Sequence, residues 1–277
     1  MTRPSAHHIL ILIACGGITL SSCNKDEVII GPSGQTEGEY REPTAASSRY
    51  ADRVYDYTPA PGQFINDPSS GGMTDEILTM QDACIWAKSR LDKRQFVSLG
   101  GFGGYIVVGF DHSILSSDGE YDFAVAGNAF FNSSGGGGSN EPGIVYVMQD
   151  SNGNGLPDDT WYELKGSESG SGDVMRDYSV TYYKPDMPAS DVEWQDNRGE
   201  SGFIDYLPAF HKQPYYYPAW ISDTSYTLSG TCLKARNDQD SATGLWNNNA
   251  YDFGYSDNMG NDACSTEDFA QCNRFRS

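Results

Sequence analysis

The chain has 277 residues, of which 38 are acidic and 18 are basic, giving a net charge of −20. This charge argues against a nucleic-acid-binding protein, because binding phosphate requires a basic surface. Aromatic residues make up 13% of the chain, which argues against disorder, while 31 Gly and 13 Pro disfavour long helices, so the composition indicates a loop-rich, acidic β protein.

The first 22 residues have the features of an export signal. Arg3 is followed by the apolar run from Ile9 to Ala14, and the segment ends in Leu20-Ser21-Ser22 before Cys23. The run is too short to span a bilayer. Because the end of the segment resembles a bacterial lipobox, we expect residues 1–22 to be a lipoprotein signal peptide and Cys23 to be lipidated. The alternative is an ordinary secretory signal that is cleaved elsewhere.

The next segment is polar and rich in Gly, Ser and Pro, which predicts a flexible tether over residues 23–48. Its start, Asn24-Lys25-Asp26-Glu27, resembles the surface-export signal of Bacteroidetes lipoproteins. We therefore expect a protein that is lipid-anchored in the outer membrane and exposed at the cell surface. Residues 49–277 are expected to form a ligand-binding β-sandwich.

Four cysteines remain after the signal and the lipobox: Cys84, Cys232, Cys264 and Cys272. An exported location permits disulfides, and four cysteines allow three connectivities. Cys264 and Cys272 are close enough in sequence to close a small loop. Metal binding by these cysteines is a weak alternative, because no CxxC pair is present.

The elements that follow are predicted to be one helix and then strands. Thr74 can cap a helix over residues 75–91, in which Ile77, Met80, Cys84, Ala87 and Leu91 form one apolar stripe. The glycines at 100–104 predict a strained entry into the first strand, and those at 135–138 a surface loop. Seven short strands without intervening helices predict a mostly β, jelly-roll-like sandwich. The strands are 104–110, 121–126, 144–149, 161–164, 178–183, 202–206 and 226–234.

One loop has the spacing of oxygen ligands found in calcium sites. It places side-chain oxygens at positions 1, 3 and 5, a glycine at position 6, a backbone carbonyl at 7 and carboxylates after it. Trp161 stands at position 12, where an EF-hand requires Glu, so the loop is not an EF-hand. The alternative is an acidic hairpin turn. If calcium binds, we expect it to rigidify the turn through Asp150, Asn152, Asn154, Leu156, Asp158 and Asp159.

Catalytic motifs are scarce. His112 and His211 are the only histidines after the signal, so a three-His zinc site cannot form, and there is no Gly-x-Ser-x-Gly or His-Glu-x-x-His motif. Paired carboxylates are the one arrangement that composition leaves open, and they would suit a glycosidase. The acids that could contribute are Glu120, Asp122, Glu141, Glu163 and Asp205.

Three segments combine aromatic side chains with amides and acids: 193–197, 210–220 and 246–249. Flat apolar faces with polar rims suit a sugar ring or a large planar ligand. The alternative is that these aromatic side chains fold inward as a satellite core. The predicted ligand-binding residues are Trp194, Asn197, His211, Tyr215, Tyr216, Trp220, Trp246 and Asn248.

Several segments together resemble a family of Bacteroidetes cell-surface lipoproteins, often described as cell-surface or PKD-containing proteins. They are residues 103–112, 141–147, 150–164 and 180–185, and the resemblance covers about residues 50–273. Some such proteins lie in cobalamin-uptake loci beside an outer-membrane transporter, so the resemblance implies cobalamin binding. The departure is at the C-terminus, where we expect relatives to continue with further strands.

These features predict a surface protein that binds a ligand without chemistry and passes it to an outer-membrane transporter. Cobalamin or a related corrinoid is the leading ligand, because aromatic platforms with amide and acid groups can hold a broad ring that has amide-bearing edges. A glycan-binding module of a polysaccharide-uptake system is the alternative, and a glycosidase is the third possibility.

Overall fold

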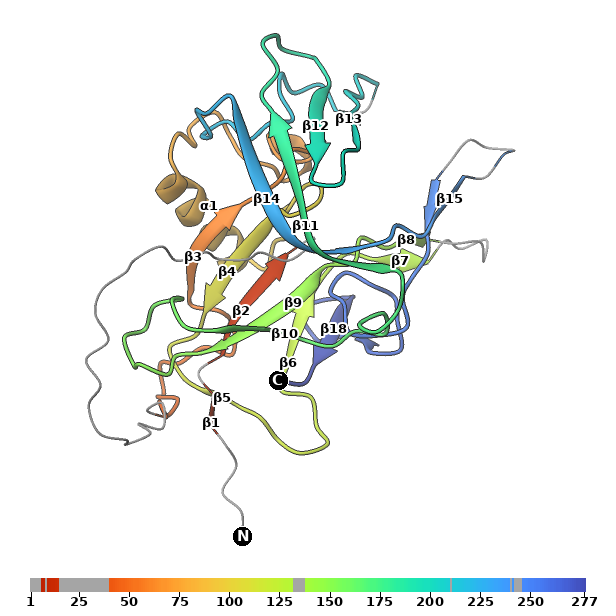
Figure 1. Ribbon diagram of the computed structural model, residues 1–277. Coiled ribbons are helices and arrows are strands. Elements are labelled where there is room, and N and C mark those ends of the chain that lie inside the picture. Colours follow the sequence, from red (N-terminus) through yellow and green to blue (C-terminus); the bar gives the residue numbers. More distant parts are fainter. Residues whose placement is uncertain are drawn as a thin grey trace, which may run out of the picture.

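The chain folds mainly into antiparallel β-sheets (Figure 1). The computed structural model describes residues 6–7, 9–14, 40–131, 138–209, 211–239, 241 and 246–277. Its largest sheet has five strands in the order β10-β9-β2-β4-β3. These are β2 (Ile9–Ala14), β3 (Arg53–Thr58), β4 (Tyr105–Gly109), β9 (Ile144–Gln149) and β10 (Trp161–Glu163).

The second sheet has four strands in the order β13-β12-β11-β14 and comes from one continuous part of the chain. Its strands are β11 (Val174–Tyr183), β12 (Val192–Asp196), β13 (Ser201–Ile204) and β14 (Ser225–Leu233). β11 and β14 pair over most of their lengths, with a bulge between Met175 and Tyr178. In Figure 1 this sheet rises above the five-stranded sheet.

The remaining strands are short. A three-stranded sheet pairs β6 (Phe123–Ala126) with β18 (Cys272–Phe275) and β18 with β17 (Ala263–Cys264). Three two-stranded ladders join β1 (Ala6–His7) to β5 (Ile114–Leu115), β7 (Phe130–Phe131) to β8 (Gly138–Ser139), and β15 (Asn237–Gln239) to β16 (Trp246–Asn248).

Helix α1 (Met80–Asp92) begins five residues later than the sequence pattern predicts. Thr79, and not Thr74, is the N-cap: its hydroxyl accepts the Asp82 N–H at 3.1 Å and donates to the Asp82 carboxylate at 2.7 Å. This reciprocal arrangement satisfies a free donor of the first turn, which explains where the helix starts. Ahead of it, η1 (Pro68–Ser70) is a single turn of 3₁₀-helix.

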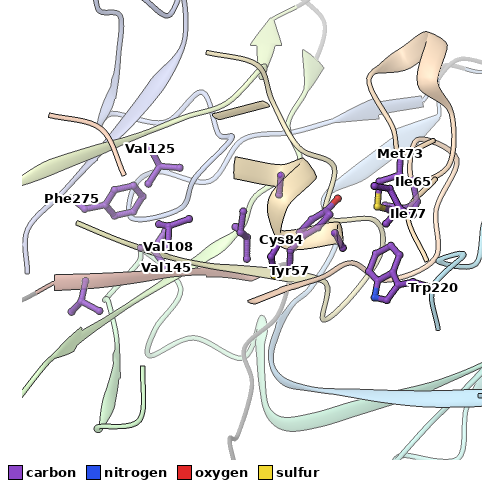
Figure 2. Close-up of a cluster of buried hydrophobic side chains, with 14 residues drawn as sticks. Tyr57, Ile65, Met73, Ile77, Cys84, Val108, Val125, Val145, Trp220 and Phe275 are labelled. Carbon is purple, nitrogen blue, oxygen red and sulfur yellow. The ribbon is translucent and has the colours of Figure 1, made fainter. Parts of the chain in front are cut away.

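The main core lies between α1, the five-stranded sheet and the β6–β18 pair (Figure 2). Figure 2 shows Val108, Val125, Val145 and Phe275 at one end of this cluster and Trp220 at the other. Tyr57 and Cys84 lie between the two ends. A second cluster covers the opposite face of the five-stranded sheet, and a third lies on the four-stranded sheet. Both faces of the five-stranded sheet are therefore buried.

Glycines shape the entry into β4, as predicted. Gly100 has φ 73°, and a Cβ there would lie 2.0 Å from the Ala60 carbonyl oxygen. A Cβ at Gly104 would lie 1.7 Å from the Leu99 carbonyl oxygen. Only glycine permits this approach of two backbone segments. The predicted loop of glycines at 135–138 falls largely outside the described residues.

The mostly β, sandwich-like fold with one α-helix among the described residues is confirmed, and each of the seven predicted strands corresponds to an observed one. The strand pairings do not establish the jelly-roll connections. In the two large sheets, three strands were not predicted: β2 lies in the expected export signal, β3 was not singled out, and β12 lies in a segment interpreted as an aromatic loop. In β12, burial alternates from Val192 to Asp196, which is the period of a strand.

Part of the predicted tether is fixed to the folded body. Arg41 and Ser113 exchange backbone hydrogen bonds, since Ser113 N–H donates to the Arg41 carbonyl at 2.9 Å and Arg41 N–H donates to the Ser113 hydroxyl at 3.0 Å. Ser47 donates to Asp111 at 2.9 Å. Residues 41–47 therefore contact the folded part of the chain, although they lie in the segment predicted to be a tether.

All four cysteines of the folded part are free thiols in the structure. Cys264 and Cys272 face each other in the β17–β18 ladder. Burial and the neighbouring Cys264 raise the pKa of Cys272. Burial raises the pKa of both Cys84 and Cys232 to about 11.

Candidate functional site

The loop between β9 and β10 holds the oxygen-rich motif, Asp150 to Asp159. Asp150 is 1% exposed at the end of β9. Its Oδ2 accepts hydrogen bonds from the Arg41 guanidinium at 3.1 Å and from Gly155 N–H at 2.9 Å. Tyr55 donates to the Gly155 carbonyl at 2.6 Å. These contacts fix the base of the loop to β3 and to Arg41.

The other oxygen of Asp150, Oδ1, is buried and has no hydrogen-bond partner among the described residues. A buried, unpaired carboxylate oxygen is costly, because it has lost its hydration without compensation. Arg41 offsets the charge from one side only. This oxygen is the feature of the loop that best fits a cation ligand.

The remaining predicted ligands are bonded within the loop. Asn152 and Asn154 accept backbone N–H groups two residues on, at 2.9 and 2.7 Å, and their amide groups donate to Asp158. Asp159 accepts the Ser151 hydroxyl at 2.6 Å. Leu156 is half exposed. Across the described chain, no three His, Cys, Asp or Glu side chains converge as a metal-binding group.

A cleft of about 1150 Å³ lies among the described residues. Apolar side chains from β4 and β6, including Ile106, Val108 and Val125, line one part of it. Another part carries amide, acidic and aromatic groups from distant segments. These groups are Asn128, Asn140, Glu141, Trp246, Asn249, Tyr251 and Asp257.

Two carboxylates in the cleft have raised pKa values. Burial raises the pKa of Asp257, although Asn128 and Ala129 donate their backbone N–H groups to it at 2.6 and 2.7 Å. Glu141 stays open to solvent within the cleft, but partial desolvation and the charge of Asp257 raise its pKa. The two segments are joined by the backbone bridge between Gly143 and Ser256. This part of the cleft therefore favours neutral or hydrogen-bond-donating groups over anions.

Trp246 is the predicted aromatic residue that lies most openly in this cleft, with 64% of its surface exposed. It begins β16, and Asn248 of the same strand accepts a hydrogen bond on its carbonyl from the Asn140 side chain at 2.7 Å. Tyr216 also borders the cleft but is 1% exposed. Its hydroxyl donates to the His211 carbonyl and accepts Leu207 N–H.

Other predicted aromatic residues serve packing. Trp220 is 9% exposed in the main core, stacks on Tyr57 at 6.1 Å between ring centroids, and has no hydrogen-bond partner for its Nε1 among the described atoms. Trp194 packs on the four-stranded sheet, over Gly202. Neither tryptophan lines the cleft. The structure thus places the three predicted tryptophans in three different environments.

The polar residues of the predicted site are also dispersed. Asn197 closes the turn after β12 by bonding Ser179 and Asp177. Tyr215 is exposed, and its carbonyl accepts a hydrogen bond from Asn66. In the segment 210–220, Tyr216 and Trp220 fit the alternative in which the aromatic side chains fold inward. In the segment 246–249, Trp246 fits the interpretation of an exposed aromatic surface.

His211 belongs to a cluster centred on Asp67. Its Nδ1 lies 3.0 Å from Asp67 Oδ2, and the hydroxyls of Ser69 and Ser70 both bond Asp67. Burial acts to raise the pKa of Asp67, but the hydrogen bonds from Ser69, His211 and Ser70 outweigh it and lower the pKa to about 2. A nucleophilic triad needs Ser bonded to His, so this cluster caps η1 instead. His112 likewise bonds its neighbour Asp111, at 2.7 Å.

The sequence analysis missed the joint position of Asn140, Asp257 and Trp246. Asn140 lies more than 100 positions before Trp246 and Asp257, and no local motif connects the two segments. Glu141 was considered only as one of many acids. The sole signal in the sequence was the abundance of Asn and Asp residues around 247–258. This abundance does not indicate which other residues contact them.

The chain matches no family model, and no curated protein is significantly similar to it. Among the described residues, no helix has the length and apolar character needed to cross a bilayer.

Proposed function

We propose that the protein is a lipid-anchored, surface-exposed ligand-binding protein that captures cobalamin or a related corrinoid for an outer-membrane transporter. The observation that carries this proposal is the cleft of about 1150 Å³. Sites for small molecules typically measure about 300–1000 Å³, so this cleft suits a ligand larger than a simple metabolite. A corrin ring is broad, with an apolar face and amide-bearing edges.

The residues that line the cleft include apolar and amide groups, which suit the apolar face and the amide-bearing edges of a corrin ring. Phe96 and Trp246 offer exposed apolar surface, whereas Asn128 offers an exposed amide group. The raised pKa values of Glu141 and Asp257 disfavour anions and suit the neutral amides of a corrinoid. Binding requires no chemistry from these residues.

The test is isothermal titration of the detergent-purified lipoprotein with cyanocobalamin. We expect sub-micromolar affinity and, for Trp246→Ala, a loss of about tenfold or more, since a truncated aromatic anchor costs about 2 kcal/mol. Trp194→Ala is the matched control, because Trp194 lies outside the cleft. The proposal would be rejected if a folded sample gave no heat of binding, or if both variants lost affinity for cyanocobalamin equally.

A glycan is the second candidate ligand, favoured by the exposed face of Trp246 and the run of asparagines that follows it in 247–249. An exposed aromatic ring beside amides suits stacking on a sugar. Retardation of the protein on an immobilised polysaccharide, lost in Trp246→Ala, would favour this candidate. Turnover of a glycoside that is lost in Glu141→Gln would instead indicate the glycosidase.

We also propose a structural calcium ion in the loop from Asp150 to Asp159, supported by the unpaired Oδ1 of Asp150. Asp150, Asn152, Asn154, Asp158 and the Leu156 carbonyl would supply oxygens. Asp158 is exposed, so Asp158→Asn tests this site without burying a new group. We expect calcium to raise the unfolding temperature of the unmodified protein and less so that of Asp158→Asn. Asp118→Asn, at another exposed carboxylate, is the control. Equal responses in all three would reject the site.

A further inference from the structure

The centre of the five-stranded sheet is supplied by a segment distant from the rest of the fold. Strand β2 pairs with β4 from Ile11↔Val108 to Ala14↔Tyr105, and with β9 from Ile9↔Gln149 to Ala14↔Ile144. Both pairings are antiparallel. The inner backbone N–H and C=O groups of β4 and β9 therefore have their partners on β2 and not on each other.

The same residues, 9–14, form the apolar run of the predicted export signal. The inference below rests on the proposed processing of the chain before Cys23. Cleavage there removes β2 and leaves a position one strand wide between β4 and β9. The two flanking strands are then two strand spacings apart, about 10 Å, which is too far for them to pair directly.

The vacated position is apolar on both sides. Ile106, Val108 and Val145 belong to the main core on one face, and Val107 and Met148 to the second cluster on the other; all five are less than 9% exposed. A strand between them must be apolar at consecutive positions, because both of its faces are buried. Exposing these apolar rows to water is costly, and the unpaired backbone groups of β4 and β9 would be open to pairing with another strand.

We propose that this position in the processed protein accepts a strand from a partner polypeptide. The partner segment has at least six consecutive uncharged, apolar and β-prone residues, and it runs antiparallel to both β4 and β9. Strand addition of this kind takes affinity from backbone hydrogen bonds and specificity from side-chain pockets. The acceptor position is defined by Tyr105–Val108 and Ile144–Gln149.

The test uses the processed lipoprotein in detergent and a synthetic peptide of residues 5–16 with a lysine tag for solubility. Hydrogen exchange is followed by mass spectrometry with and without peptide. We expect stoichiometric binding and exchange slowed at least about tenfold in 105–108 and 144–149, with no change in β14. A Leu12→Pro peptide is the control, because proline removes a ladder donor. It should give no protection.

Several results would overturn the proposal. These are full protection of both strands without peptide, no binding of the peptide, or N-terminal sequencing that finds residues 1–22 in the mature protein. Protection that grows with protein concentration and accompanies dimerisation would assign the position to a second copy instead of a partner.

If the processed chain does not fold alone, refolding with the peptide decides the matter. Recovery with the unmodified peptide, but not with the Leu12→Pro peptide, supports the proposal, and failure with both rejects it. Cyanocobalamin titration of the peptide-bound protein is a separate readout, so loss of the proposed ligand leaves the strand result interpretable.

Discussion

The two large sheets differ in how their strands are drawn from the sequence. The four-stranded sheet is built from residues 174–233. β11 pairs with β12, and β12 pairs with β13, so these pairings join strands that are consecutive in sequence. The pairing of β11 with β14 encloses β12, β13 and the segment that follows them. The five-stranded sheet joins strands from residues 9 to 163 and places the first of the five in its middle. Local pairings form with a small loss of chain entropy, whereas the five-stranded sheet depends on contacts between distant segments. Damage to the five-stranded sheet should therefore be more severe than damage to the four-stranded sheet.

The largest expected effect is at Tyr57, where the five-stranded sheet meets α1. Tyr57 is fully buried, lies between Trp86 and Trp220, and donates its hydroxyl to the Ser98 carbonyl at 2.6 Å. We expect Tyr57→Ala to lower the free energy of unfolding by about 3–5 kcal/mol, through lost packing and a cavity. Urea unfolding monitored by tryptophan fluorescence measures it.

The control is Tyr183→Ala in the four-stranded sheet, where 36% of the side chain is exposed. We expect this change to cost less than about 1 kcal/mol. Equal costs would mean that the two sheets do not differ as described.

A disulfide would stabilise the three-stranded sheet, which packs against the main core. Cys264 and Cys272 are direct partners in the β17–β18 ladder, where side chains typically lie about 4.5–5.5 Å apart at Cβ, close to disulfide geometry. Oxidation should link them and stabilise the fold by about 2–3 kcal/mol. Thiol titration should show two of the four thiols lost, with Cys84 and Cys232 left free. A mass-spectrometric link through either of those two would contradict the prediction.

Asp67 joins the two regions, because it lies in the loop after β3 and bonds His211, which follows β13. Its pKa of about 2 is below the ordinary value of 3.8, so the ionised group stabilises the fold above about pH 4. That contribution is lost as the pH falls to about 2. Allowing for screening by solvent, Asp67→Asn should cost about 1–2 kcal/mol at pH 7 and almost nothing at pH 2.

Chemical denaturation at several pH values measures this difference. Asp118→Asn, at an exposed carboxylate, should leave the pH profile unchanged. A cost for Asp67→Asn that is the same at pH 7 and pH 2 would contradict the linkage.

The smallest effect is expected at the start of α1. Thr79→Ala should lower the free energy of unfolding by about 1 kcal/mol, because it removes the N-cap. Thr74→Ala should have almost no effect, although the sequence pattern selects Thr74 as the cap. Thermal unfolding of both variants compares the two positions, and a larger loss at Thr74 would show that the helix begins earlier.

The sequence predicted what depends on local pattern. The continuous apolar run at 144–149 and the alternation around 226–234 indicated strands within one or two residues of their observed ends. The cap at Thr79 was missed because Thr74 also precedes acidic residues, and the reciprocal hydrogen bonds between Thr79 and Asp82 are seen only in the structure. β12 was missed because residues 193–197 were interpreted as an aromatic segment that binds a ligand, although their burial alternates as in a strand.

The candidate site was less predictable for a physical reason. Trp246 was identified because exposed aromatic residues among amides are visible in sequence. Trp220 looks the same in sequence, and its burial against Tyr57 depends on how α1 packs. The cleft exists because segments near residues 128, 140 and 257 converge. No pattern within any one of these segments predicts that they come together.

The ion pair between Arg41 and Asp150 also marks where the chain that follows Cys23 is attached to the folded part. In the proposed lipid-anchored form, Cys23 lies 18 residues before Arg41 (41 − 23), so the chain can reach at most about 60 Å from the membrane to this attachment point. In that form, the chain from Cys23 would join the folded part beside the loop from Asp150 to Asp159. Because Arg41 also exchanges hydrogen bonds with Ser113, a variant that removes the ion pair alone should leave this attachment point in place.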